Sequence, residues 1–143
     1  AALVQADATA WMPPAPLDAV LLDAPCSATG TIRRHPDILH LKRPRDVQAL
    51  TRQQDALLAA AIRMLRPGGR LVYAVCSLQP EEGSPRVAAA LAQGGVRLDP
   101  FTPEELQAIP EARTPEGFLR THPGLWADRG GMDGFFAARL IRV

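Results

Sequence analysis

Two short apolar runs, separated by an amphipathic segment, constrain the fold of this chain more than any other feature. Residues 17–23 are largely apolar, end in Asp23 and precede Pro25, which a central strand would not tolerate. Residues 70–76 form the second run. Between the runs, apolar side chains recur at helical spacing over residues 47–65, and Pro67-Gly68-Gly69 predicts the end of that helix. The pattern predicts strand, helix, strand, with a connection long enough for a right-handed parallel crossover.

The flanking segments predict shorter elements. A helix is expected to run to Gly94-Gly95. Residues 79–82 would place the acids Glu81-Glu82 in its first turn, or the start is delayed to Ser84 as N-cap with Pro85 as the first helical residue. The remaining predictions are short strands at residues 3–5 and 96–98, a short helix at 103–109 and a last strand at 133–141. The sequence shows no internal repeat, and we expect these elements to form one α/β unit.

Composition excludes several classes of protein. The 143 residues carry a formal net charge of +1, so any affinity for nucleic acid must come from a local patch. No apolar stretch approaches the roughly 18 residues of a membrane-spanning helix. The first residues lack the basic run and apolar block of a secretion signal. We therefore expect a cytoplasmic protein without membrane contact.

The two cysteines carry the most reactive chemistry. Cys26 and Cys76 form no C-x-x-C pair, so neither a metal site nor a thioredoxin-like site is expected. Each stands at the end of a predicted strand, and in a doubly wound sheet the carboxyl ends of parallel strands share one edge. Asp23 and both thiols are therefore expected to converge on one cleft, an arrangement suited to nucleophilic catalysis.

Other interpretations of the thiols fit less well or stay open. A tyrosine-phosphatase loop needs five residues between its Cys and its Arg, whereas residues 27–32 place six between Cys26 and Arg33. No histidine stands in a papain-like context. A disulfide is disfavoured because cytosolic thiols stay reduced. Two small buried hydrophobic residues remain the alternative without chemistry.

Four ordered motifs carry a family resemblance, and they occupy residues 23–38, 66–69, 75–82 and 133–136. The first begins Asp-Ala-Pro-Cys-Ser, and the third contains Cys-Ser-Leu-Gln-Pro-Glu-Glu. Together they resemble the Sun (Fmu) family of RNA cytosine-C5 methyltransferases. The resemblance implies a Rossmann-like α/β sheet with parallel strands, an antiparallel last strand and helices on both faces. It also implies ribosomal RNA as the substrate and S-adenosylmethionine as the cofactor.

The resemblance assigns roles to individual residues. Cys76 would be the nucleophile that adds to C6 of cytosine, and Cys26 would help to release the methylated base from the covalent adduct. Asp7 would lie beside the adenine of the cofactor, and Asp23 and Pro25 would contact the cofactor at the strand end. Asp23 has a second interpretation as a group that orients the base, and Asp7 has a plainer one as a turn former.

A basic segment between the two cysteine motifs is the candidate RNA contact. Its cationic side chains are Arg33, Arg34, Lys42, Arg43 and Arg45. Such a run is usually a solvated face. Beside a site that must bind RNA, however, we expect it to contact phosphates and to make binding dependent on salt.

Three features depart from the family pattern. Gly83-Ser84-Pro85 replaces the Asn-Glu that usually follows the paired glutamates, which affects the start of the helix there. Ala28 stands where the family usually has Gly, which is a small change if Gly30 supplies the flexibility of the loop. No glycine-rich cofactor loop precedes Asp7. We therefore expect the C-terminal portion of a catalytic domain, inactive by itself, whose exposed strand edge favours self-association. The alternative is a fragment or degenerate paralogue that binds RNA or a partner without catalysis.

Overall fold

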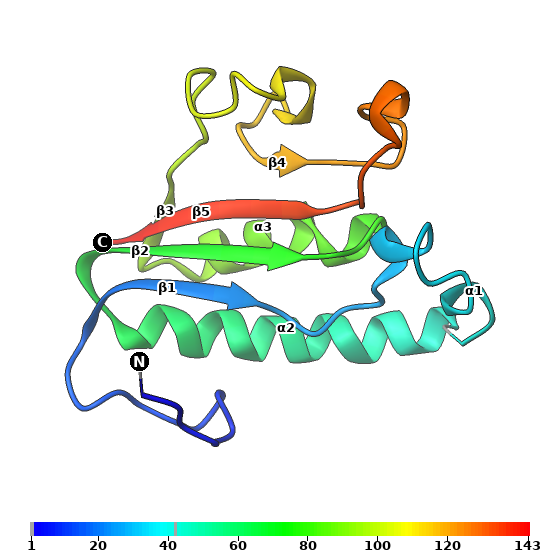
Figure 1. Ribbon diagram of the computed structural model, residues 1–143. Helices are drawn as coiled ribbons and strands as arrows, with labels where there is room; N and C mark the ends of the chain where they lie inside the picture. Colours follow the sequence, from blue (N-terminus) through cyan, green and yellow to red (C-terminus); the bar gives the residue numbers. More distant parts are fainter. Residues whose placement is uncertain (1, 42) are drawn as a thin grey trace.

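The computed structural model of the chain describes residues 2–41 and 43–143 and centres on a mixed β-sheet. The strands are β1 (Leu17–Asp23), β2 (Leu65–Val75), β3 (Val96–Leu98), β4 (Leu119–Arg120) and β5 (Phe136–Arg142). The strand order is β1-β2-β5-β3, and β4 pairs with β5. The α-helices are α1 (Ile38–Leu41), α2 (Pro44–Met64) and α3 (Ser84–Gln93). Figure 1 shows α2 running along β1.

The predicted strand, helix, strand unit is confirmed. β1 has the predicted bounds and pairs in parallel with β2, so that Asp23 lies opposite Ala74. The helix ends earlier than expected, at Met64, because the backbone of Leu65 is already extended. β2 therefore includes Pro67-Gly68-Gly69, and the register with β1 shifts around this irregular start.

β5 is the antiparallel strand that the resemblance implies. It pairs antiparallel with β2 on one side and with β3 on the other, so β3 runs in the same direction as β1 and β2. It begins at Phe136 rather than at residue 133. The strand starts later because the Gly134 N–H donates to the carbonyl of Gly30 at 2.8 Å instead of to a neighbouring strand.

The positions of the helices need a correction. Helices α2 and α3 contact each other and share one core with the inward side chains of the sheet, so both lie on the same face. The two crossovers, β1 to β2 and β2 to β3, progress in one direction across the sheet, and right-handed crossovers then place their helices on one side. On the opposite face Leu21 is 72% exposed. Helices on both faces are therefore not found among the described residues.

Three local predictions are wrong. Residues 3–5 are exposed and form no strand, because no neighbouring strand pairs with them. Residues 103–109 form turns, since a short segment that ends before Pro110 is below the length of a stable helix. The N-cap of α3 is Gly83, and Ser84 is already helical.

Two further features bear on binding partners. Within residues 2–41 and 43–143, β1 pairs only with β2, so the other edge of β1 has no partner strand. Self-association through this edge stays a prediction. None of the described helices has the length and apolar character needed to span a bilayer.

Candidate functional site

Two thiols face each other at the carboxyl ends of β1 and β2. The sulfur atoms of Cys26 and Cys76 lie 3.5 Å apart, and both residues are half-buried free cysteines. The loops that carry them are joined through the backbone, because the Ala24 N–H donates to Ala74 and the Gly30 N–H donates to the carbonyl of Cys76. The structure thus brings the two thiols together, as the parallel pairing of their strands predicts.

The environment of Cys26 favours the neutral thiol. Burial raises the pKa of Cys26 to about 12, and the neighbouring Cys76 and Glu82 add to the increase, while a backbone hydrogen bond at Ala28 opposes it. Cys26 is therefore protonated at neutral pH and can donate a hydrogen bond to the sulfur of Cys76. Since the thiolate is the nucleophilic form of cysteine, this environment disfavours attack on a substrate by Cys26.

A buried polar network lies behind the thiols. Ser27 and Ser77, the residues that follow the two cysteines, are fully buried, and their hydroxyl oxygens lie 3.0 Å apart. Both hydroxyls contact the carboxylate of Glu82, which ends the 3-10 helix η2 (Pro80–Glu82) and is also fully buried. The sequence prediction missed this network, because the pair Glu81-Glu82 has the appearance of an acidic first helical turn.

The loop after β2 is also held from two other sides. Arg120 donates to the carbonyls of Ser77 at 3.1 Å and Leu78 at 2.9 Å. The hydroxyl oxygen of Thr29 accepts a hydrogen bond from the Leu78 N–H at 2.9 Å. The backbone around Cys76 is therefore fixed by side chains from β4 and from the Cys26 loop.

Ala28 adopts a left-handed backbone conformation, with φ at 58°. Left-handed φ is costly for a residue with a Cβ and easy for glycine. Gly30 has a different requirement, because a Cβ added there would lie 1.8 Å from the carbonyl oxygen of Gly134. The expectation that Gly30 supplies the flexibility of the loop is therefore wrong: position 28 needs the left-handed backbone, and position 30 needs the absence of a side chain.

Two of the three predicted cofactor contacts lie at the thiol end of the sheet. Asp23 ends β1 and is exposed, and Pro25 is exposed, with its carbonyl accepting a hydrogen bond from Gln54 Nε2 at 2.9 Å. An exposed carboxylate at this edge can accept hydrogen bonds from the amino or hydroxyl groups of a nucleoside cofactor. This pair therefore fits one part of such a cofactor.

The structure does not bring Asp7 to the thiols. Its carboxylate accepts hydrogen bonds from the Thr9 hydroxyl at 2.7 Å and the Thr9 N–H at 2.9 Å, and these bonds lower the pKa of Asp7. The carbonyl of Thr9 accepts a hydrogen bond from Arg63 in the last turn of α2, which leads into the start of β2. Asp7 thus forms a turn in a segment bound near the other end of the strands, as its plainer interpretation predicts.

The basic segment is exposed but carries acidic partners. Asp133 pairs with Arg34, whose Nε lies 2.7 Å from the carboxylate, and with Arg33 at 3.5 Å. Arg43 is the N-cap of α2 and donates its backbone N–H to Asp46. Arg45 lies 3.9 Å from the same Asp46, and Lys42 lies outside the described residues. The exposed fractions of Arg33 and Arg34, 44% and 52%, leave both guanidinium groups accessible to a phosphate.

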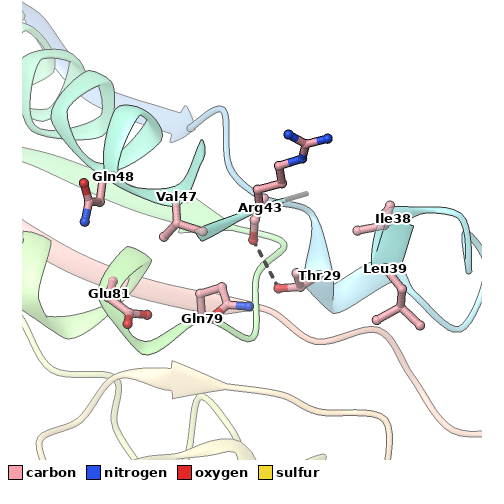
Figure 2. Close-up of a pocket in the computed structure, with 9 residues that line it drawn as sticks. Thr29, Ile38, Leu39, Arg43, Val47, Gln48, Gln79 and Glu81 are labelled. Carbon is pink, nitrogen blue, oxygen red and sulfur yellow. Dashed lines mark hydrogen bonds between the residues drawn. The ribbon is translucent and has the colours of Figure 1, made fainter. Parts of the chain in front are cut away.

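A cavity of about 460 Å³ lies between the basic segment and the loops that carry the thiols. Its lining includes Ser27, Thr29, Ile38, Leu39, Arg43, Val47, Gln48, Gln79 and Glu81. Figure 2 shows Val47 and Gln48 of α2 across the cavity from Gln79 and Glu81. Ile38, Leu39 and Val47 are the apolar part of this lining, and the other six residues are polar or charged. Such a mixed lining suits a ligand that has both apolar and hydrogen-bonding groups, as the base of a nucleotide does.

A family model described as 16S rRNA methyltransferase RsmB/F matches residues 1–141. The chain belongs to the RsmB/F family. The resemblance inferred from the four motifs is therefore confirmed. The chain is 46% identical over 133 residues to Ribosomal RNA small subunit methyltransferase B of Klebsiella pneumoniae. It is 44% identical over 134 residues to the protein of that name from Salmonella newport. These matches cover 92% of the chain and 28% of each relative.

Solved structures share the fold of this RsmB/F chain. NSun6 from Pyrococcus horikoshii with SFG superposes with a TM-score of 0.77 and 30% identity, over 99% of the chain and 34% of that protein. A methyltransferase homolog protein from Pyrococcus horikoshii gives a TM-score of 0.66 and 29% identity, over 90% of the chain and 40% of that protein. The Rossmann-like methyltransferase sheet is thereby confirmed.

Proposed function

We propose that this chain is the thiol-bearing portion of an enzyme that methylates C5 of cytosine in ribosomal RNA of the 16S type, with S-adenosylmethionine as the methyl donor. The observation that carries the proposal is the pair of thiols 3.5 Å apart, at the ends of two parallel strands, in a chain of the RsmB/F family. The chain spans 28% of the length of its relatives, so the activity is proposed for a longer, cytoplasmic protein.

The two thiols divide the reaction between them in this proposal. The thiolate of Cys76 adds to C6 of cytosine, which breaks the C5–C6 double bond and makes C5 electron-rich. S-adenosylmethionine, when bound, supplies the methyl group that C5 takes. Loss of the C5 proton and cleavage of the bond from sulfur to C6 then restore the double bond and release Cys76. Cys26, which burial keeps protonated, assists that release by donating a hydrogen bond to the departing sulfur.

The surrounding residues bind and position the substrates. Asp23 and Pro25 contact the cofactor at the end of β1, a role supported by their exposure beside the thiols. The solved NSun6 relative contains SFG, an analogue of S-adenosylmethionine, which supports the same class of cofactor here. The candidate phosphate contacts are Arg33, Arg34, Lys42, Arg43 and Arg45.

The test is methyl transfer by the protein expressed with its upstream coding sequence. Incubation with small-subunit ribosomal RNA and methyl-labelled S-adenosylmethionine should give labelled 5-methylcytidine. Cys76→Ser should abolish the label, whereas Arg97→Ala, at the exposed position of β3, should leave it unchanged. A label on another nucleoside, or full activity of Cys76→Ser, would contradict the proposal.

The 143-residue chain by itself should bind the cofactor weakly. Only Asp23 and Pro25, of the three predicted contacts, lie at the thiol end, and the chain covers 28% of the length of its relatives. Calorimetry is therefore expected to detect weak binding of S-adenosylmethionine or none. Tight stoichiometric binding would show that this chain holds a complete cofactor site.

A further inference from the structure

One carboxylate joins the two loops that carry the thiols. Glu82 Oε2 accepts hydrogen bonds from the hydroxyl of Ser27 at 2.6 Å and from the hydroxyl of Ser77 at 2.5 Å. Ser27 directly follows Cys26, and Ser77 directly follows Cys76. A single buried group therefore holds the chain neighbour of each thiol.

The other oxygen of the same carboxylate extends the network to the backbone and to α2. Glu82 Oε1 accepts hydrogen bonds from the Ser27 N–H at 2.9 Å and from Gln54 Nε2 at 3.0 Å. Gln54 is fully buried, and its Nε2 also donates to the carbonyl of Pro25, next to Cys26. All of these groups act as donors toward Glu82, so both oxygens of its carboxyl group are occupied as acceptors.

Glu82 is itself fixed in place from the sheet. Its backbone carbonyl accepts a hydrogen bond at 2.7 Å from the hydroxyl of Tyr73, a fully buried residue of β2. The next residue, Gly83, lies so close to Phe136 of β5 that an added Cβ would meet the ring at 3.3 Å. The carboxylate is thus presented from a rigid base rather than from a mobile loop.

Stability alone does not require a carboxylate here. Burying a charge costs free energy, and a buried polar cluster can often be replaced by apolar side chains of similar volume without loss of stability. What the carboxylate adds is directional contact with several donors at fixed positions. That property suits a group whose task is to set a geometry.

We propose that Glu82 is a positioning residue that sets the separation of Cys26 and Cys76 by holding Ser27 and Ser77. The consequence for methyl transfer rests on the proposed function, whereas the control of the thiol separation does not. Glu82 acts through the two serines and makes no hydrogen bond to either sulfur among the described residues.

The test measures how readily the two thiols pair. In a buffer of reduced and oxidised glutathione, Cys26 and Cys76 form a disulfide while one oxidised glutathione is reduced to two molecules of reduced glutathione. The equilibrium constant of this exchange gives the effective concentration of one cysteine thiol at the other. We expect Glu82→Gln to lower it about tenfold or more, because the amide nitrogen meets donors where the carboxylate accepted them. The control is Leu58→Ala, which destabilises the core at a buried position of α2 and should leave the equilibrium unchanged.

A second variant keeps the test decisive if Glu82→Gln folds poorly. Ser77→Ala removes one donor and should lower the effective concentration by a smaller factor. In the Glu82→Gln background the same change should have no further effect, because both act through one contact. Wild-type pairing in Glu82→Gln or in Ser77→Ala, or full additivity of the two changes, would overturn the inference.

Methyl transfer then separates this inference from the proposed function. In the longer enzyme, Glu82→Gln should lower kcat and leave the KM for RNA unchanged. If the glutathione result holds but the wild-type protein transfers no methyl group, the proposed function fails and the role of Glu82 stands. If the wild-type protein is active and Glu82→Gln keeps its kcat and its thiol equilibrium, the role of Glu82 fails alone.

Discussion

The loops that carry the thiols and the basic segment differ in how tightly the protein holds them. In the loops, Ser27, Ser77 and Glu82 are fully buried and bonded to one another. In the basic segment, the guanidinium groups of Arg33 and Arg34 are about half exposed and pair with a single carboxylate, that of Asp133.

This difference matches two kinds of task. A reacting pair of thiols gains from a fixed separation, because misplacement of reacting groups by a fraction of an ångström slows a reaction. Contacts with phosphates tolerate motion, because they depend on charge more than on geometry. Under the proposed function, the buried network would serve the chemistry and the exposed side chains would serve the binding of RNA.

The largest expected effect comes from removing the centre of the network. Glu82→Ala leaves its buried donors without an acceptor, and we expect it to lower the free energy of unfolding by about 3 kcal/mol or more, as measured by urea denaturation. Glu81→Ala, at the exposed neighbour, should change it by no more than about 0.5 kcal/mol. Equal effects at the two positions would remove the distinction between a held site and a solvated surface.

A smaller effect of opposite sign is expected within the Cys26 loop. Ala28→Gly relieves the left-handed backbone at this position and should raise the free energy of unfolding by about 1 kcal/mol. Gly30→Ala is the matched change in the opposite direction, since its Cβ would clash with the Gly134 carbonyl and should destabilise the protein. A destabilising Ala28→Gly would show that the backbone there is not strained.

The smallest expected effect is in the basic segment. Arg43→Ala and Arg45→Ala should each weaken RNA binding only a few-fold at moderate salt, and each should reduce the slope of log affinity against log salt by about 0.7 to 0.9. Their unfolding free energies should stay within about 0.5 kcal/mol of the wild-type value. An unchanged salt slope in both variants would exclude Arg43 and Arg45 as phosphate contacts.

Local sequence patterns predicted the parallel pair of strands well. The bounds of β1, the parallel crossover and the meeting of the two thiols depend on contiguous apolar runs and on proline and glycine at their ends. The last strand was predicted from its residue pattern, and its antiparallel direction came from the family resemblance. Helices on both faces came from the family resemblance, whereas α2 and α3 share one face, because the two crossovers progress in the same direction across the sheet.

The buried network lay beyond prediction from sequence for a physical reason. Glu81 and Glu82 are identical neighbours in the chain, and only tertiary packing leaves one exposed and buries the other under Ser27 and Ser77. The roles of Ala28 and Gly30 were misread for the same reason. Whether a small residue serves a left-handed backbone or a close contact depends on its partner, here Gly134, which lies about 100 residues away in the sequence.

The most direct test of the account is the fate of the covalent RNA adduct in the two single-cysteine variants of the longer protein. With ribosomal RNA and S-adenosylmethionine, Cys26→Ala should accumulate a protein–RNA complex that survives denaturing electrophoresis, because the adduct forms but is released slowly. Cys76→Ala should form none. The reverse pattern would exchange the roles of the two thiols, and the absence of an adduct in both variants would contradict covalent catalysis by this pair.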